Sequence, residues 1–402
     1  MATSSPTVEA DGSIPWGSSV LYVILAISLT GIMGVSLISP VLPELRGALN
    51  ISDAQAGLVL TAYTLPGVLL TPFVGLVADR IGRRRVIIPL LFTFGIAGAA
   101  IGFAESFEQV LALRFVQGMG ASALITLSVT LIGDLYEGQT QNAVMGFNGS
   151  TIGTGAAFYP LLGGLLGSIR WNVPFFFFGI AILVGVFATV ILTEPDGLEP
   201  DPVAIYIGRL RDVLLLPQAL AILAAILVVF AVFYGSVLTV LPLLLSDEFG
   251  LTSGEIGPVL AGVALASAIV SSQFGRISQW RRSQELVALG YVAFGSSLLG
   301  IWLAPSPVFI FISLLAFGVG FGITMPSIDT TIIGLVSSEL RAGMMGIRTS
   351  VLRLGQTIGP FAFTYAAETY FETTVIGYRR LLLGSGLAVV SIGAIGYLVL
   401  RE

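Results

Sequence analysis

Cysteine, histidine and lysine are all absent from the 402 residues, and each absence removes a class of chemistry. Without cysteine there is no disulfide and no reactive thiol, and without histidine as well there is no zinc site of the usual kind. A proton that moves near neutral pH has only carboxylates to carry it. The sequence therefore predicts no enzyme of these classes, no metal site and no cofactor.

Charge is also scarce. Charged residues make up 10% of the chain, all 18 basic residues are arginine, and the formal net charge is −5. This acidic balance implies no nucleic-acid partner. No loop of the form GxxxxGK[ST] occurs, so direct coupling to ATP is not expected.

Apolar residues, in contrast, account for 55% of the chain, and the mean hydropathy is +0.96. Soluble domains rarely exceed about half apolar, so the composition predicts an integral membrane protein. A span needs about 20 apolar residues. Twelve runs qualify, which predicts an all-α membrane fold: 18–43, 54–75, 86–104, 108–134, 143–166, 172–193, 218–245, 254–275, 285–304, 308–335, 344–366 and 376–399.

The chain repeats itself at an offset of 200 residues. Met145-Gly146 recurs as Met345-Gly346, and Pro160 recurs as Pro360. A constant offset across several spans predicts two parallel six-span halves. The expected organisation is a tail (1–17), an N-terminal six-helix bundle (18–195), a proline-rich linker (196–217) and a C-terminal six-helix bundle (218–402).

Arginines predict the orientation in the cell membrane. With both termini in the cytoplasm, eleven arginines fall on the cytoplasmic side and four on the outer side, as expected from the positive-inside rule. The tail and the linker are then cytoplasmic.

The most charged stretch is 75–85, between the second and third spans. Its arginines alone predict only a generic cytoplasmic loop. The ordered spacing is more specific, and it resembles the signature loop of the major facilitator superfamily: Gly75, Asp79, Arg80, Gly82, Arg83 and Arg84.

Three further stretches narrow the resemblance to the twelve-span drug:proton antiporters of that superfamily. They are Gly34-x5-Pro40-Val-Leu-Pro43, Arg114-x2-Gln117-Gly118-x-Gly120 and Gly155-x4-Pro160-x2-Gly163-Gly164, the last with Tyr159 where the family usually has glycine. The resemblance implies two pseudo-symmetric bundles with substrate bound between them near the midplane. It also implies that Arg83 bridges the loop to Asp134, that Asp79 meets Ala342–Met344, and that this gate favours the state closed to the cytoplasm.

Charges within spans are the sharpest candidates for proton coupling, because each costs about 2.5–3.5 kcal/mol at the centre of a helix. In the family that the chain resembles, an arginine at the position of Arg114 is implicated in proton coupling. Asp329 and Arg348 lie at similar depths, so we expect them to pair. A proton-coupling carboxylate at Asp329 and a static ion pair are both open readings.

Two sets of residues complete the candidates. Helix bending is expected at Pro160, Gly163, Gly164 and Pro360, as a hinge or a mere kink. The substrate cavity is expected to be lined by bulky or charged residues at mid-membrane depth, although lipid-facing aromatics look the same in sequence: Tyr63, Phe158, Tyr159, Tyr234, Met325, Arg353 and Phe361.

The function expected is proton-coupled efflux of hydrophobic or amphipathic small molecules by a monomer in the lipid bilayer. Uniport is open, because no acidic residue lies near the midplane of the first half. Export of a specific metabolite, sugar or siderophore is an alternative. A membrane receptor or scaffold that does not transport is an alternative of another class.

Overall fold

The computed structural model describes residues 13–194, 217–335 and 341–401, and every regular element within them is helical. The first half contains α1 (Ser19–Ser36), η1 (Ser39–Val41), α2 (Leu42–Leu49), α3 (Asp53–Ile81), α4 (Arg83–Ala100), η2 (Ile101–Phe103), α5 (Phe107–Ala121), α6 (Leu124–Leu135), α7 (Gly138–Gly167), α8 (Val173–Phe177) and α9 (Ile180–Ile191). The second contains α11 (Pro217–Val232), η3 (Phe233–Val240), α12 (Leu241–Phe249), α13 (Ser253–Ser272), α14 (Phe274–Ile277), α15 (Ser283–Leu303), α16 (Pro307–Leu335), α17 (Arg341–Tyr370) and α18 (Thr374–Arg401). The prediction of an all-helical membrane fold is confirmed.

Ten helical stretches of the described residues are long and apolar enough to cross a membrane. The helices α7 and α17 have 30 residues each, about 45 Å at 1.5 Å per residue. They are long enough to span, but glycine and polar residues lower their hydropathy. Helices suit this environment, because they satisfy their backbone hydrogen bonds internally.

The repeat at 200 residues is visible in how helices begin. Ser52 caps α3 and Thr252 caps α13, each in a capping box completed by Gln55 or Glu255. A capping box satisfies backbone N–H groups that the first turn leaves free. The two helices therefore begin at equivalent points of the two halves.

The first spanning helix of each half departs from α geometry before a proline. In the first half, the 3-10 turn η1 contains Pro40 and separates α1 from α2. In the second half, η3 is a π-helix that runs continuously into α12, which has Pro242 in its first turn. Proline cannot donate a backbone hydrogen bond, so it is tolerated at these starts.

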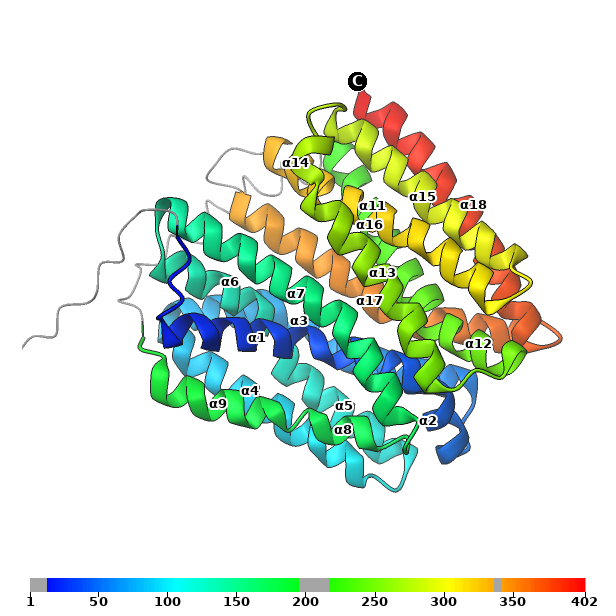
Figure 1. Cartoon of the computed structure of the whole chain (residues 1–402), viewed down its shortest axis with the longest axis horizontal. Helices are drawn as coiled ribbons and strands as arrows, with labels where there is room; N and C mark the ends of the chain where they lie inside the picture. The colour runs from blue at the N-terminus through cyan, green and yellow to red at the C-terminus, as the bar shows by residue number, and fades with distance from the viewer. Residues whose placement is uncertain (1–12, 195–216, 336–340, 402) are drawn as a thin grey trace, which may run out of the picture.

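The two bundles lie side by side (Figure 1), and they meet where α3 packs against α17 and α7 packs against α13. The helices α2 and α12 contact each other at one end of the molecule, called the Arg46 end below. The turn between α3 and α4 lies at the opposite end, the Arg83 end. Of the expected linker 196–217, only Pro217 is described, so the domain boundaries stay predictions.

Candidate functional site

At the Arg83 end, Arg83 at the start of α4 forms an ion pair with Asp134 near the end of α6. The two side chains are 11% and 13% exposed, so most of the pair is shielded from solvent. Both residues belong to the first bundle. The pair therefore ties the charged turn to α6 and does not join the two halves.

The turn itself depends on Gly82, which has a φ of 106° in the region that favours glycine. The carboxylate of Glu194 lies against Gly82 and accepts a hydrogen bond from the backbone N–H of Arg84 at 3.3 Å. The Arg84 guanidinium donates to the Thr189 carbonyl at 2.8 Å. The sequence analysis missed Glu194, since an acid after the last apolar residue of a span looks like ordinary solvated charge.

The remaining residues of the signature have fewer described contacts. Gly75 has open space around it on α3, and Arg80 is exposed. The side chain of Asp79 and those of Arg341–Gly343 lie outside the described residues. The predicted contact between Asp79 and 342–344 therefore stays a prediction.

A second charged cluster, which the sequence analysis missed, joins the halves at the Arg46 end. The Arg46 guanidinium donates to Asp53 at 2.5 Å and to both carboxylate oxygens of Asp247 at 2.5 and 2.9 Å. Asp53 is on α3 and Asp247 is on α12, in different halves. This Arg46 cluster holds the two bundles together at one end.

Two backbone contacts from acidic side chains reinforce this closure. Glu44 accepts a hydrogen bond from the backbone N–H of Ser253 at 2.6 Å, and Glu368 accepts one from Ala54 at 2.9 Å. Each bond crosses from one half to the other. Each acid also lies against the first turn of a helix, where a negative charge is favoured.

Close backbone approach explains the prolines and glycines of α7 and α17. The carbonyl of Pro160 lies against Gly257 of α13, and the carbonyl of Pro360 lies against Gly57 of α3. A side chain at either glycine would collide with its proline. Both helices are continuous through their prolines, so the structure shows close packing there. Bending stays a prediction.

Gly163 and Gly164 also lie against the backbone of neighbouring segments. The carbonyl of Leu37 lies against Gly163, and that of Ser253 lies against Gly164. Small residues of this kind let membrane helices come close.

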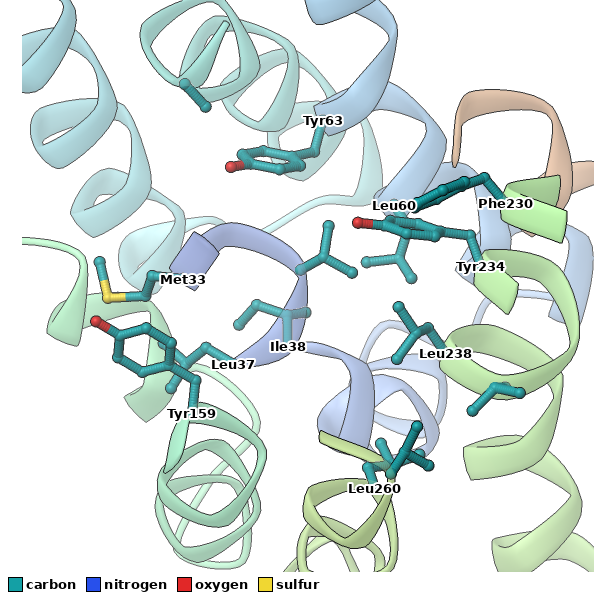
Figure 2. Close-up of a cluster of buried hydrophobic side chains, with 14 of the residues drawn as sticks. Met33, Leu37, Ile38, Leu60, Tyr63, Tyr159, Phe230, Tyr234, Leu238 and Leu260 are labelled. Carbon is teal, nitrogen blue, oxygen red and sulfur yellow. The ribbon is translucent and has the colours of Figure 1, made fainter. Parts of the chain in front are cut away.

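Buried aromatic and aliphatic side chains from both halves gather between the bundles (Figure 2). Among the residues predicted to line the cavity, Tyr63, Tyr159 and Tyr234 belong to this cluster and are 7–9% exposed. Met325 and Phe361 are partly buried, whereas Phe158 is 51% exposed. The structure thus brings three of the predicted aromatics together.

Arg114 is fully buried in the first bundle. Its guanidinium donates to the Gly34 carbonyl at 3.1 Å and to the Gln117 side chain at 2.9 Å. It also lies over the ring of Tyr63, with 5.0 Å to the centroid. These contacts bring together Gly34, Gln117 and Arg114, which belong to two of the sequence motifs, and none of the acceptors is a carboxylate.

Arg353 reaches from α17 across to the first half. Its guanidinium lies against Gly67 of α3 and donates to the Ser122 carbonyl at 3.0 Å. Three residues further along α17, Gln356 donates to the Tyr234 hydroxyl at 2.8 Å. Both side chains thus face the region between the bundles.

The ion pair predicted between Asp329 and Arg348 is present, with 2.7 Å between Oδ1 and Nε. Asp329 is 36% exposed and Arg348 is 14% exposed. Both belong to the second bundle. The carboxylate is therefore paired through Oδ1, which is buried, while the side chain as a whole is only partly covered by the protein. In the described part of the chain, no group of three or more acids that could hold a metal is found.

Comparison with known proteins gives a consistent result. The family model "Major Facilitator Superfamily" matches residues 24–360 and 222–401. The chain is 26% identical over 353 residues to the Bacillibactin exporter of Bacillus subtilis (strain 168), covering 84% of this chain and 87% of that one. It is 28% identical over 395 residues to the class E tetracycline resistance protein of Escherichia coli, covering 92% of each.

Solved structures agree on the fold. A bacterial homologue of the human lysosomal transporter Spinster, inward-facing and unoccupied, superposes with a TM-score of 0.84 at 18% identity, covering 97% of this chain and 98% of that one. A mutant form of the nucleoside transporter NupG superposes with a TM-score of 0.80 at 12% identity, covering 95% of this chain and 99% of that one.

Proposed function

Because the chain belongs to the Major Facilitator Superfamily and is a multi-pass transporter of the cell membrane rather than an enzyme, we propose that it exports hydrophobic or amphipathic small molecules in exchange for protons. The drug-resistance and exporter names of its relatives support efflux.

The observation that carries this proposal is the way the two bundles meet. They share a buried aromatic cluster, and the Arg46 cluster joins them across one end. Separation of Asp247 from Arg46 would open that end, while the close contacts of α3 with α17 and of α7 with α13 act as the surfaces on which the halves rock. This is alternating access about a central site.

Proton coupling is assigned to Asp329. Its carboxylate is paired with Arg348 and partly exposed. Protonation of Asp329 neutralises its carboxylate and weakens the ion pair with Arg348. Uptake of a proton would thereby shift the packing of α16 against α17. Arg114 has no ion-pair partner among the described residues, and its part in coupling stays a prediction from resemblance.

Orientation completes the proposal. The Arg83 end, which carries the arginine-rich turn, faces the cytoplasm together with both termini. The closed Arg46 end then faces outward, and a substrate enters the monomer from the cytoplasm or the inner leaflet.

A more specific exporter is the second candidate. Similarity to a protein named as an exporter of bacillibactin supports a siderophore-like or other defined metabolite as the alternative substrate.

The test is flux in inverted membrane vesicles that contain the full chain. Transport of a panel of amphipathic dyes and metabolites is followed with and without an imposed pH gradient. Uphill accumulation that a protonophore abolishes is the expected result. Transport that ignores the pH gradient would reject proton coupling, and no uphill transport of any compound would favour a receptor or scaffold.

A further inference from the structure

Two guanidinium groups on membrane-spanning helices, those of Arg114 and Arg353, have no acidic partner among the described residues. Arg114 is fully buried, and Arg353 is partly buried. The ion pairs of the described residues involve other arginines, and neither Arg114 nor Arg353 takes part in one. A charge removed from water is costly unless an opposite charge or full hydrogen bonding compensates it.

Hydrogen bonding compensates these two only in part. The acceptors of Arg114 are a carbonyl and an amide, and the acceptor of Arg353 is the Ser122 carbonyl. Three buried donors have no hydrogen-bond partner among the residues that the structure describes, namely Nε and Nη2 of Arg114 and Nε of Arg353. Arg114 also lies over the rings of Tyr63, Phe175 and Phe178, at 5.0, 5.6 and 6.0 Å from their centroids, which compensates part of its charge. Donor capacity on both guanidinium groups is still left unused by the described residues.

The two cations approach one place from opposite halves. Tyr63 interacts electrostatically with both, and its ring lies under Arg114. Gly67, one turn further along α3, lies against Arg353. The Tyr234 hydroxyl, held by Gln356, lies within electrostatic range of Arg353 and Tyr63. Around this place the structure thus offers two guanidinium groups, two phenols and an amide. The rings of Tyr63 and Tyr234 lie there among apolar side chains such as Leu60 (Figure 2).

We propose that the substrate is an organic anion, an aromatic or aliphatic body whose carboxylate is bound by Arg353 from one half and by the field of Arg114 from the other. This inference rests on the proposed function and narrows its substrate class. A carboxylate matches the fork of a guanidinium better than a single carbonyl does. The anion would replace the Ser122 carbonyl as the acceptor of Arg353, and it would thereby loosen a contact between the halves.

The test compares a matched pair of probes, 2-naphthoate and 2-naphthamide, which share size and ring but differ in charge. Their binding to the purified full chain in lipid nanodiscs is measured by calorimetry or competition at low salt. Arg353→Gln removes the charge and keeps hydrogen bonding, whereas Arg353→Lys keeps the charge. Arg170→Gln, at an exposed position just beyond the end of α7, is the matched control.

We expect naphthoate to bind at least about tenfold more tightly than naphthamide, as for a charge-assisted hydrogen bond in a buried site. Arg353→Gln should bring naphthoate to the level of naphthamide without changing naphthamide. Arg353→Lys should retain most of the preference, and Arg170→Gln all of it.

Equal affinities of the two probes, or a preference that survives Arg353→Gln, would overturn the inference. Because binding is measured without a gradient, the result is independent of flux. Anion binding without vesicle transport would refute the proposed function alone, and transport of cationic or neutral compounds without anion binding would refute only the substrate class.

Discussion

The two interfaces between the bundles have the same backbone plan and different charge. Pro360 lies against Gly57 where α17 meets α3, and Pro160 lies against Gly257 where α7 meets α13. At the first interface Arg353 projects onto α3. The residue 200 positions earlier is Gly153, where an added Cβ would lie in ordinary contact, 3.8 Å from the Cβ of Ala268. We expect the contacts that the two interfaces share to permit movement of the halves. The charges that differ between the interfaces are our candidates for binding and coupling.

The other buried or paired charges show the same asymmetry. Asp329 has Val129 as its counterpart, and Arg114 has Leu314. Ser283 and Gly334 stand where the first half has Arg83 and Asp134. A repeat that preserves glycine and proline but not charge indicates that packing is common to both halves, while chemistry is divided between them.

The largest effect is expected from removing the charge found only in the second half. Asp329→Asn should reduce pH-driven flux to the level of vesicles without the protein, because the amide cannot take up a proton. Insertion should be unchanged, as judged by the amount of protein in the membrane. Glu372→Gln, at an exposed acid, is the control. Normal pH-dependent transport in Asp329→Asn would remove this residue from the mechanism.

Disrupting the glycine–proline contact should have a smaller effect than Asp329→Asn, and the effect should be equal at the two interfaces. Gly57→Leu and Gly257→Leu each force a side chain onto a proline carbonyl, at a cost of about 1–3 kcal/mol. Both should open the Arg46 end. The chain has no cysteine, so a single cysteine at the buried Ile38 reports this directly by its labelling rate.

Gly47→Leu is the matched control, because no atom lies within 4 Å of a Cβ at that position. Faster labelling in only one of the two interface variants would show that the interfaces do not move together.

The Arg83–Asp134 pair tests the asymmetry at the opposite end. Arg83→Ala should lower the free energy of unfolding by about 2 kcal/mol, a value between those for exposed and for buried ion pairs. The pair holds the charged turn to α6, and the resemblance implies that this turn closes the Arg83 end. Loss of the pair should therefore shift the resting state towards the form open at that end, which a cysteine at the buried Met344 would report by labelling. Arg85→Ala, exposed in the same turn, should leave labelling unchanged. Unaltered labelling in Arg83→Ala would contradict a gating role for the pair.

The smallest effect is expected at the Arg46 cluster, whose arginine is 22% exposed and therefore screened by solvent. Arg46→Gln should shift the equilibrium towards opening of the Arg46 end by about 1 kcal/mol. The wild-type chain should move in the same direction when the salt concentration rises, and the variant should respond less. Labelling at Ile38 measures both. An identical salt response in the two proteins would exclude this cluster as a lock.

Local signals were enough to predict much of this architecture. Membrane helices are set by apolar runs, and the offset between Pro160 and Pro360 exposed the repeat. The pairing of Asp329 with Arg348 followed from the cost of leaving either alone in a membrane. Each of these inferences follows from the hydropathy and charge of individual segments.

Contacts between charged residues far apart in the sequence could not be predicted from such local signals. Arg46 and Asp247 are 201 positions apart, and Glu194 is 110 positions from Arg84. Arg46, Asp247 and Glu194 look like solvated charges at the ends of spans, where most arginines and acids have no specific partner, and the signature that contains Arg84 does not point to Glu194. Only the three-dimensional packing of the bundles decides which of them meet.

The π-helix η3 allows the second half a change of helical winding, and the first half has a 3-10 turn at the corresponding place. Its eight residues lie between α11 and α12, which carries Asp247. A π segment accommodates an additional residue per turn, and its return to α geometry would rotate the following helix by about 100°, one residue's share of a turn. The carboxylate facing Arg46 could then swing away by a change of winding within one helix, with no loop required to absorb the displacement.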